Sequence, residues 1–498
     1  MLLQEAAKQE IRPAMPSIRS RRLPLGAAML AVVLSLAPPA FAAPAAQPDG
    51  GEASFRSLYK GLVETNTTLS SGSCTRAAQL AADHLAAAGM ARENLYLLVA
   101  PGHPEEGNLV AVFPGRDARG KGKAPAKAAV LLLAHLDVVE ARREDWIRDP
   151  FTLIEEDGWF YARGASDAKS LAAIWIDTLA RFARDGTRPK RTVKVALTCG
   201  EETNGAFNGA EWLAKEHRGL IDADFALNEG GGGTADATGR VHTQTVQVGE
   251  KIFANFELAT KNPGGHSSAP RPDNAIYDLA RAMLAVEAHP FPVEFTEVTR
   301  AALAARARVE KSAMAVAIAA LLADPTDAEA DKVLSADPYL RSNTRTTCVA
   351  TMVEAGHARN ALAQGAKANI NCRIFPGHAI EDIRAELVAA IGNPAVTVTT
   401  LPPVRPAPPA PPLTPALMRP IETLTQRHYP GATVGVSMAN GYTDSTYLTA
   451  AGIPAYGTPG LWTGPEETGV HGLNERIRVK ALMDGRTFLY DLVRAYAG

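Results

Sequence analysis

The stretch AAVLLLAHLD (128–137) decides the fold of this 498-residue chain, because an apolar run leads directly into a histidine and an aspartate. Strands that are apolar on both faces are typical of the buried interior of a parallel sheet. Two further stretches, TVKVALT (192–198) and FALN (225–228), have the same character and lead into acidic residues. We therefore expect three consecutive buried strands with polar side chains at their ends.

Helical periodicity separates these strands. Apolar residues recur at helical spacing over 170–182 and 209–215, and an earlier helical pattern that begins at Phe55 stops near Gly89. The same rhythm resumes toward the C-terminus with a predicted helix over 417–428. The alternation of strands and helices predicts an α/β fold, a three-layer catalytic domain with a mixed, largely parallel sheet.

The rhythm breaks near Val246. The residues VQVGEKIFANFELAT (246–260) alternate like one half-buried antiparallel strand. The strands expected after it are 347–353 and 366–374, and the helices are 273–287, 310–322 and 380–391. Such a series predicts an inserted α+β domain of about 150 residues, a usual domain size.

These patterns divide the chain into segments. We expect a signal peptide (1–42), a first part of the catalytic domain (43–245), an inserted domain (246–400) and a second catalytic part (401–498). Residues 402–412 (PPVRPAPPAPP) are too rich in proline for the interior of a sheet and are expected to form an extended linker.

The composition excludes several classes of protein. Apolar residues make up 46% and charged residues 21% of the chain, which fits a globular protein and excludes a collagen, a coiled coil or an acidic disordered tail. Lys and Arg number 51 against 53 Asp and Glu. The resulting net charge of −2 supplies no positive field for nucleic acid, and we expect no nucleic-acid partner.

The first 42 residues have the order of a secretory signal peptide. Basic residues at 19–22 precede an apolar run at 25–36, and Ala40-Phe41-Ala42 forms a small-x-small cleavage site. The apolar run is short for a membrane span, so we expect cleavage before Ala43 and no span afterwards. Cleavage removes five basic and two acidic residues and leaves a net charge of −5. We expect a periplasmic or secreted protein, exported by the general or the twin-arginine route.

Histidine and carboxylate side chains follow the predicted strands. His135 and Asp137 are two residues apart on an extended chain, so both point the same way and Asp137 is placed to orient the imidazole. Taken singly, each of these groups has an ordinary explanation, such as a turn, a helix N-cap or an exposed acidic pair. Ligands bind at the C-terminal ends of strands in open α/β sheets, so the groups together predict a site. The other members are Asp167 in RGASDAKS, Glu201 and Glu202 in TCGEETNG, Glu229 in LNEGGGG and His471 in GVHGLNERI.

This set of side chains has the chemistry of a metal site. Histidine nitrogens and carboxylate oxygens bind zinc and harder relatives such as manganese and cobalt. Two such ions that share a carboxylate activate a water molecule and stabilise the oxyanion of an attacked carbonyl. A glutamate that stays uncoordinated then serves as general base. The sequence therefore predicts a metal-dependent hydrolase.

Seven motifs, in order along the chain, carry a family resemblance: LLLAHLDVV, DGWFYARGASDAKS, TCGEETNGAFNGAEWL, LNEGG, PGGHSSAP, NINCRIFPG and VHGLNERI. They resemble the aminoacylase, carboxypeptidase G and yeast carboxypeptidase S family of co-catalytic dizinc hydrolases, over about residues 55–495. The forms GEETNG and LNEGG are most similar to the carboxypeptidase S and N-acyl-amino-acid hydrolase branch. The resemblance implies the phosphorylase/hydrolase-like fold of zinc exopeptidases, interrupted by a ferredoxin-like lid and dimerisation domain.

The resemblance implies a role for each candidate. Two Zn²⁺ ions would bind per subunit. His135 and Glu229 would hold one ion, Glu202 and His471 would hold the other, and Asp167 would bridge both. Co²⁺ or Mn²⁺ would suit the same ligands. Asp137 would orient His135, and Glu201 would be the general base. A cis peptide bond is implied between Asp167 and Ala168, where relatives often carry a second Asp.

The resemblance also assigns residues of the inserted domain. His266 in PGGHSSAP would stabilise the oxyanion, often across a homodimer formed through the lid. Arg373 in NINCRIFPG would pair with the substrate's free carboxylate, which suits a guanidinium fork. Asn343 and Asn360 are further candidates for polar contacts with the substrate. Asp444 in NGYTDSTY matches a recurrent segment near the site and is equally suited to forming a turn.

The four cysteines are too few for a disulfide-built scaffold. Cys199 directly precedes Gly200-Glu201, but we expect a buried thiol at a strand end and not a nucleophile, because no histidine follows at a recognised spacing. Cys348 and Cys372 lie on two predicted strands, and the sequence leaves their pairing open. Cys74 has no evident partner.

The expected reaction is cleavage of an amide bond next to a free carboxylate in short peptides, as in a carboxypeptidase or dipeptidase. An aminoacylase that acts on N-acyl amino acids is the first alternative, because the sequence does not identify the pocket for the acyl group. A catalytically silent metal-binding protein is a more distant alternative. The complete set of ligands and the base argue against it.

Overall fold

The buried run that opens the sequence argument is β3 (Ala129–His135), inside a ten-stranded sheet. It lies between β6 (Thr192–Thr198) and β7 (Phe225–Asn228), and β7 pairs with β17 (Ala455–Gly457); all three pairs are parallel. Antiparallel strands flank this centre, since β2 pairs with β6 and β9 with β17. The sheet is therefore mixed with a parallel centre, as predicted. Its other strands are β1 (Leu95–Leu98), β2 (Asn108–Phe113), β8 (Gly232–Ala235), β9 (Val241–Glu250), β16 (Thr433–Ala439) and β18 (Trp462–Thr463).

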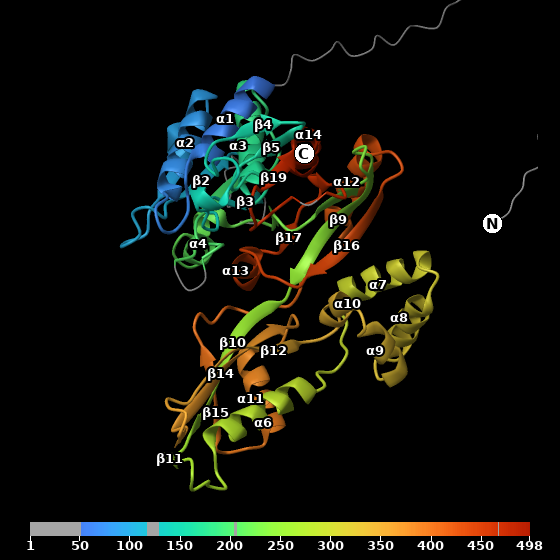
Figure 1. Ribbon diagram of the computed structural model, residues 1–498. Helices are drawn as coiled ribbons and strands as arrows, with labels where there is room; N and C mark the ends of the chain where they lie inside the picture. Colours follow the sequence, from blue (N-terminus) through green and yellow to red (C-terminus); the bar gives the residue numbers. More distant parts are fainter. Residues whose placement is uncertain (1–50, 117–128, 204–206, 467) are drawn as a thin grey trace, which may run out of the picture. The chain divides into compact units, whose positions relative to one another are not determined.

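Helices cover both faces of this sheet and make three layers (Figure 1). Val130 and Leu132 pack into one core, and their neighbours Leu131 and Leu133 pack into another on the opposite face. The first core includes residues of α1 (Glu52–Glu64), α2 (Cys74–Ala87), α3 (Lys169–Arg184), α12 (Pro415–His428) and α14 (Val479–Ala497). The second includes residues of α4 (Gly209–Glu216), α5 (Arg218–Ile221) and α13 (Ser445–Ala450).

The structure is a computed structural model that describes residues 51–116, 129–203, 207–466 and 468–498. The predicted signal peptide (1–42) lies outside these residues. Among the helices of the described ranges, none combines the length and apolar character needed to cross a membrane.

A second, four-stranded sheet follows the first along the chain. Its strand order is β12-β14-β10-β15, with every pair antiparallel. Helices α6 and α11 pack on it, and the chain order β-α-β-β-α-β is that of a ferredoxin-like fold (Figure 1). The elements are β10 (Ile252–Lys261), α6 (Ala275–Ala288), β12 (Thr347–Ala355), β14 (Gly365–Ile374), α11 (Ile380–Ile391) and β15 (Val396–Leu401).

The stretch 246–260 is two strands and not the single strand we predicted. β9 ends at Glu250 in the large sheet, and β10 begins at Ile252 in the small one. Apolar residues occupy the even positions on both sides of Gly249-Glu250-Lys251, so the alternation keeps its phase where the chain changes sheets and the pattern predicted one strand. Lys251 is fully buried, and its ammonium donates to the carbonyls of Ser342 and Arg345 at 2.9 and 2.8 Å.

Four helices lie between α6 and β12, where the sequence predicted one. The predicted helix 310–322 is α8 (Ala313–Ala323), and the other three have weaker apolar patterns. Residues 402–412 contain no strand or helix. The remaining elements are α7 (Glu297–Val309), α9 (Ala328–Leu334), α10 (Pro338–Ser342), the pair β11 (Gly265–His266) and β13 (Ala361–Leu362), and a small sheet of β4 (Ile154–Glu156), β5 (Trp159–Tyr161) and β19 (Arg476–Arg478).

Both pairs of cysteines form disulfides, Cys74 with Cys199 and Cys348 with Cys372. The expectations of a free thiol at Cys199 and of no partner for Cys74 were therefore wrong. These two residues are 125 positions apart in sequence, but the packing of α2 against the sheet brings their Cα atoms to 6.0 Å. Cys348 and Cys372 lie directly opposite each other in the register of β12 and β14.

Candidate metal centre

Three neighbouring parallel strands bring the predicted ligands to one edge of the large sheet. His135 is the last residue of β3, Glu201 and Glu202 follow the end of β6, and Glu229 follows the end of β7. Because parallel strands end at the same edge, residues far apart in sequence meet there. Asp167, from the loop before α3, and His471, from the loop before β19, complete the group.

The first half of the site surrounds His135. Its Nε2 atom lies 3.2 Å from Asp167 Oδ1 and 3.4 Å from Glu229 Oε2. One donor atom from each of the three residues lies within 4.8 Å of the others. His135 is 2% exposed, so the imidazole is fixed in the protein interior.

The second half surrounds His471. Its Nε2 atom lies 2.8 Å from Glu202 Oε1 and 3.2 Å from Asp167 Oδ2. The two carboxylate oxygens of Asp167 thus face different histidines. Two groups of one histidine and two carboxylates share Asp167, and these are donor atoms that divalent cations such as zinc accept.

The electrostatics of the site favour a cation. Burial raises the pKa of Glu229 to about 7, even though His135 is near. Burial also works against ionisation of Asp167, but its hydrogen bonds to His135 and His471 hold its pKa well below the usual range. Hydrogen bonds to Asp167 and Glu202 raise the pKa of His471 to about 10. Carboxylates that are crowded and poorly solvated repel one another, and a bound cation relieves that repulsion.

Glu201 lies at the edge of the cluster and belongs to neither half. A donor atom of Glu201 lies within 4.8 Å of donors of His135 and Glu202. Burial, reinforced by the charge of Glu229, raises the pKa of Glu201 well above its usual range. A carboxylate that takes up a proton this readily has the property that a general base requires.

Asp137 contacts both sides of the centre. His135 Nδ1 lies 3.0 Å from the main-chain carbonyl of Asp137 and 3.7 Å from its carboxylate. The Asp137 carboxylate accepts hydrogen bonds from the backbone N–H groups of Glu201, at 3.3 Å, and Glu202, at 2.9 Å. Asp137 therefore positions the loop of the two glutamates as well as the histidine.

Glu475 is a functional residue that sequence reasoning missed. Its carboxylate is buried and accepts from the backbone N–H groups of Gly164, Ser166 and Asp167 at 2.8–3.0 Å. It also pairs with Arg163 at 2.7 Å. The Asp167 loop, which contains the expected cis bond to Ala168, is therefore held by a residue four positions after His471. The signal was present in the motif VHGLNERI.

Asp444 supports the loop that contains Glu201 and Glu202. It is buried and accepts hydrogen bonds from Thr198 Oγ1 at 2.8 Å and Asn208 Nδ2 at 2.7 Å. Asn208 also donates to the carbonyl of Gly200 at 3.2 Å. Asp444 thus does more than form a turn, because it ties β6 and the loop before Glu201 to α13.

Arg373 connects to the centre through aromatic rings. It lies opposite Phe253 in the pairing of β14 with β10, and its guanidinium is 5.2 Å from the Phe253 ring centroid. The Phe253 ring is 5.5 Å from that of Tyr442, whose hydroxyl donates to the carbonyl of Glu201 at 3.0 Å. Arg405 contacts the same two rings, at 4.1 and 4.3 Å.

The other predicted residues of the inserted segment lie apart from this connection. His266, on β11, is exposed and contacts Ser268 Oγ at 2.7 Å, and the carbonyl of Asn360 accepts from the N–H of Ser267. Asn343 caps α10, where its side chain donates to the carbonyl of Tyr339. Within the described ranges, no hydrogen bond, ion pair or ring contact joins these three residues to the metal candidates.

Comparisons with known proteins give relatives by sequence and by fold. Human N-fatty-acyl-amino acid synthase/hydrolase PM20D1 is 27% identical over 383 residues, which cover 75% of each chain. Carboxypeptidase S of Saccharomyces cerevisiae is 29% identical over 267 residues, which cover 51% of this chain and 46% of that protein. Among solved structures, an M20 family metallo-carboxypeptidase of Sulfolobus solfataricus has the same fold, with a TM-score of 0.64, 20% identity and coverage of 89% of this chain and 99% of the other.

A family model described as peptidase family M20/M25/M40 matches residues 131–495, a span that contains every ligand candidate. Members of this metal-dependent family are hydrolases that act on amide or peptide bonds. The chain belongs to peptidase family M20/M25/M40.

Proposed function

We propose that this protein is an exported dinuclear zinc hydrolase that cleaves an amide bond next to a free carboxylate, as a carboxypeptidase or dipeptidase of short peptides. The observation that carries the proposal is the position of Asp167, whose two oxygens face His135 and His471 separately. His135 and Glu229 would hold one ion, and Glu202 and His471 the other. Zinc bound there would polarise the substrate carbonyl and make water more acidic.

Glu201 would move the protons of the reaction. The oxygen of a water molecule adds to the carbonyl carbon while Glu201 takes up its proton. The bond from carbon to nitrogen then breaks, and Glu201 delivers the proton to the leaving amine. The position of Glu201, beside His135 and Glu202 but outside the two groups that share Asp167, supports both steps.

The inserted segment would recognise the substrate. Arg373 has the fork geometry that suits a carboxylate, and its link to Glu201 through Phe253 and Tyr442 supports a position near the reacting bond. His266 would stabilise the oxyanion once the segment closes as a lid or a second subunit contributes it. Asn343 and Asn360 stay weaker predictions for polar substrate contacts.

A homodimer through the inserted segment has support in β12. This strand is at an end of the four-stranded sheet, and Val349, Met352 and Val353 on it are 60–72% exposed. Exposed apolar edge strands favour pairing with another chain. Sedimentation of the wild type against Met352→Lys would measure this: we expect a dimer that the added charge weakens.

Export has support in the disulfides. Both pairs of cysteines are oxidised, and disulfides persist in the periplasm and outside the cell but seldom in the cytosol.

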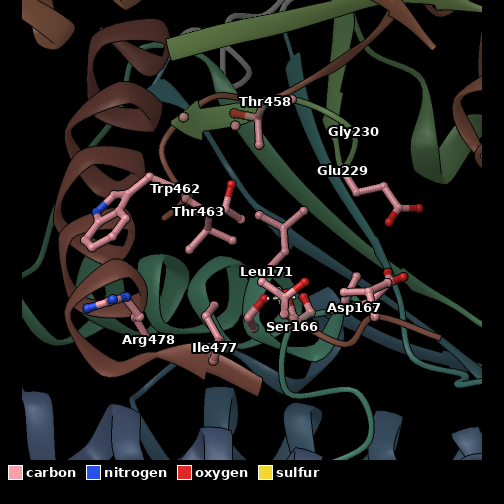
Figure 2. A pocket seen from close by; sticks show the side chains of 18 of the residues that line it. Ser166, Asp167, Leu171, Glu229, Gly230, Thr458, Trp462, Thr463, Ile477 and Arg478 are labelled. Carbon is pink, nitrogen blue, oxygen red and sulfur yellow. Dashed lines mark hydrogen bonds between the residues drawn. The ribbon is translucent and has the colours of Figure 1, made fainter. Parts of the chain in front are cut away.

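An N-acyl amino acid is the second candidate substrate, because the pocket that Asp167 and Glu229 line also includes Leu171, Trp462 and Ile477 (Figure 2). The complete set of ligands and the base argue against a catalytically silent metal-binding protein.

Glu201→Gln tests the function. We expect two metal ions per chain, as in the wild type, with kcat lowered by about 10²–10⁴-fold on dipeptides and N-acyl amino acids. Glu216→Gln, at an exposed position of the neighbouring helix α4, is the matched control. Chelation should abolish wild-type turnover, and zinc should restore it. Activity that survives both chelation and Glu201→Gln would contradict the proposal.

A further inference from the structure

A disulfide lies directly beside the loop that carries Glu201 and Glu202. Cys199 is the residue after β6, and Gly200 alone separates it from Glu201. The sulfur of Cys199 is bonded to that of Cys74, the first residue of α2. The bond therefore joins the start of the loop to a helix, two residues before the proposed base and three before a candidate metal ligand.

The helix end of this bond is fixed in place. Cys74 is 2% exposed, and α2 packs into the first core of the large sheet. Ser73 caps the helix with its side chain. Thr75 Oγ1 donates to the carbonyl of Pro104 at 2.6 Å and accepts from the backbone N–H of Gly107 at 2.8 Å. A helix that is held along its side and at its first turn gives the loop a rigid point of attachment.

The two sulfur atoms also lie close to Asp137. A carboxylate oxygen of Asp137 lies within 4.8 Å of both Sγ atoms. The same carboxylate accepts from the backbone N–H groups of Glu201 and Glu202. Cys199 is attached to the sheet as well, since its own N–H donates to Asn108 Oδ1 at 3.0 Å. The disulfide and the Asp137 carboxylate therefore hold the same short segment.

Gly200 explains why this segment needs an anchor. Its φ of 102° lies in the region that favours glycine, and a glycine has wide conformational freedom unless its neighbours are held. A Cβ atom at this position would lie 2.0 Å from the carbonyl oxygen of Phe207, so a stiffer residue does not fit. The positions of the two glutamates must therefore be fixed by the anchors on either side of the glycine.

The bond is shielded, which suits a permanent anchor. Cys74 and Cys199 are both buried, and the cavity that they line together with Asp137 and Gly200 has a volume of about 40 Å³. A space of this size holds water but has no room for a thiol reductant. Because thiol exchange requires direct attack on a sulfur atom, the bond persists while the chain is folded.

We infer that this disulfide is a positioning element of the proposed active site. It fixes Glu202 to hold its metal ion and Glu201 to transfer protons. The inference rests on the proposed function, in which Glu202 shares its ion with His471. The other ion, at His135, takes its ligands from other loops and strands, so its affinity should not depend on the bond.

The double variant Cys74→Ala/Cys199→Ala tests the inference. When the zinc-loaded protein is titrated with a chelator, one of its two ions should be bound about 10–100-fold more weakly than in the wild type, and the other equally well. The kcat should fall about tenfold or more with little change in KM, because a displaced base slows the turnover of bound substrate. Cys348→Ala/Cys372→Ala removes the other disulfide and should keep the wild-type affinity for both ions.

Cys74→Val/Cys199→Ala separates the bond from the packing of its atoms. The valine fills the space of the missing sulfur but forms no bond, so one ion should stay weakly bound. Wild-type affinity for both ions in this variant, or in the double alanine variant, would overturn the inference.

Amide hydrogen exchange of the wild type decides if neither variant folds. The amides of Glu201 and Glu202 should then exchange as slowly as those of β6, and exchange as fast as in an exposed loop would overturn the inference. If the wild type binds two ions but hydrolyses no amide, the proposed reaction fails, and the metal affinities still decide whether the bond positions Glu202. If it binds no metal, the proposed function fails, and hydrogen exchange alone decides whether the loop is held.

Discussion

The candidate metal centre at the edge of the large sheet and the inserted segment differ in how their polar side chains are held. At the edge, buried carboxylates such as Asp137 and Glu475 hold the ligand loops through backbone hydrogen bonds. In the inserted segment, His266 is exposed, contacts Ser268 of its own loop and pairs with Ala361 of β13. The candidate metal ligands therefore lie together within one fold, whereas the proposed substrate residues His266 and Arg373 would complete the site by closure or through a second subunit.

The joint between the two regions is a pair of adjacent buried residues. Glu250, at the end of β9, accepts from Thr443 Oγ1 at 3.0 Å and from Thr446 Oγ1 at 2.5 Å, and these threonines flank Asp444 in sequence. Lys251 donates instead to backbone carbonyls of the inserted segment. One peptide bond thus links a residue fixed in one region to a residue fixed in the other, which suits a hinge.

Asp167→Ala should have the largest effect, because it removes the one carboxylate that both halves of the centre share. We expect loss of tightly bound metal and of hydrolysis together, measured by metal analysis and by turnover of a dipeptide. Asp185→Ala, at the exposed C-terminal end of α3, is the control. Two metal ions retained per chain would show that Asp167 does not bridge them and that the other candidate ligands hold the ions without it.

Glu475→Gln tests whether buried support makes the metal half rigid. Gln cannot neutralise Arg163 and cannot accept all the backbone hydrogen bonds that hold the Asp167 loop. We expect a metal affinity about 10–100-fold lower, as for other residues that orient ligands. Competition with a chelator measures it, and Glu155→Gln, which breaks the exposed pair with Arg56, should have no effect.

Arg373→Ala tests the substrate half alone. The metal content should stay at the wild-type value, because no contact in the described residues joins Arg373 to a candidate metal ligand. The KM for a substrate with a free carboxylate should rise about 10–100-fold. When the carboxylate of that substrate is amidated, the variant and the wild type should have the same KM. Arg341→Ala, at an exposed position on α10, is the control. An equal loss on both substrates would show that Arg373 acts on structure and not on the carboxylate.

The ligand set could be predicted from sequence because the fold places strand ends together. His135, Glu202 and Glu229 each follow a buried apolar run, and parallel strands end at one edge. That local pattern was sufficient to predict both the α/β fold and the candidate metal centre. The ferredoxin-like order of the second sheet came from the family resemblance, since periodicity alone predicted its strands but not their pairing.

Other features could not be predicted because their partners are distant in sequence. Glu475 supports Asp167 from 308 positions away, and Cys74 pairs with Cys199 from 125. No periodic pattern relates such residues. The change of sheet at Lys251 was hidden for a different reason, because the two-residue alternation is the same on both sides of it.

Glu250→Gln should change activity least of the four variants, and it tests the stability of the joint. Burial raises the pKa of Glu250 from its ordinary 4.5 to about 7, so between these pH values the folded chain holds a proton that the unfolded chain has lost. The contribution of Glu250 to stability is therefore full below pH 4.5 and is lost as the pH rises through about 7. Gln does not titrate, so relative to the variant, the wild type should lose about 3 kcal/mol across this range.

Urea unfolding at several pH values measures this difference, and taking it against the variant cancels the titration of all other groups. Glu257→Gln, on β10, should leave the slope of the wild type intact. If Glu250→Gln keeps that slope as well, Glu250 is ionised and solvated in the folded chain. The junction between β9 and β10 would then be accessible to water, and the connection to the inserted segment would not be a buried one.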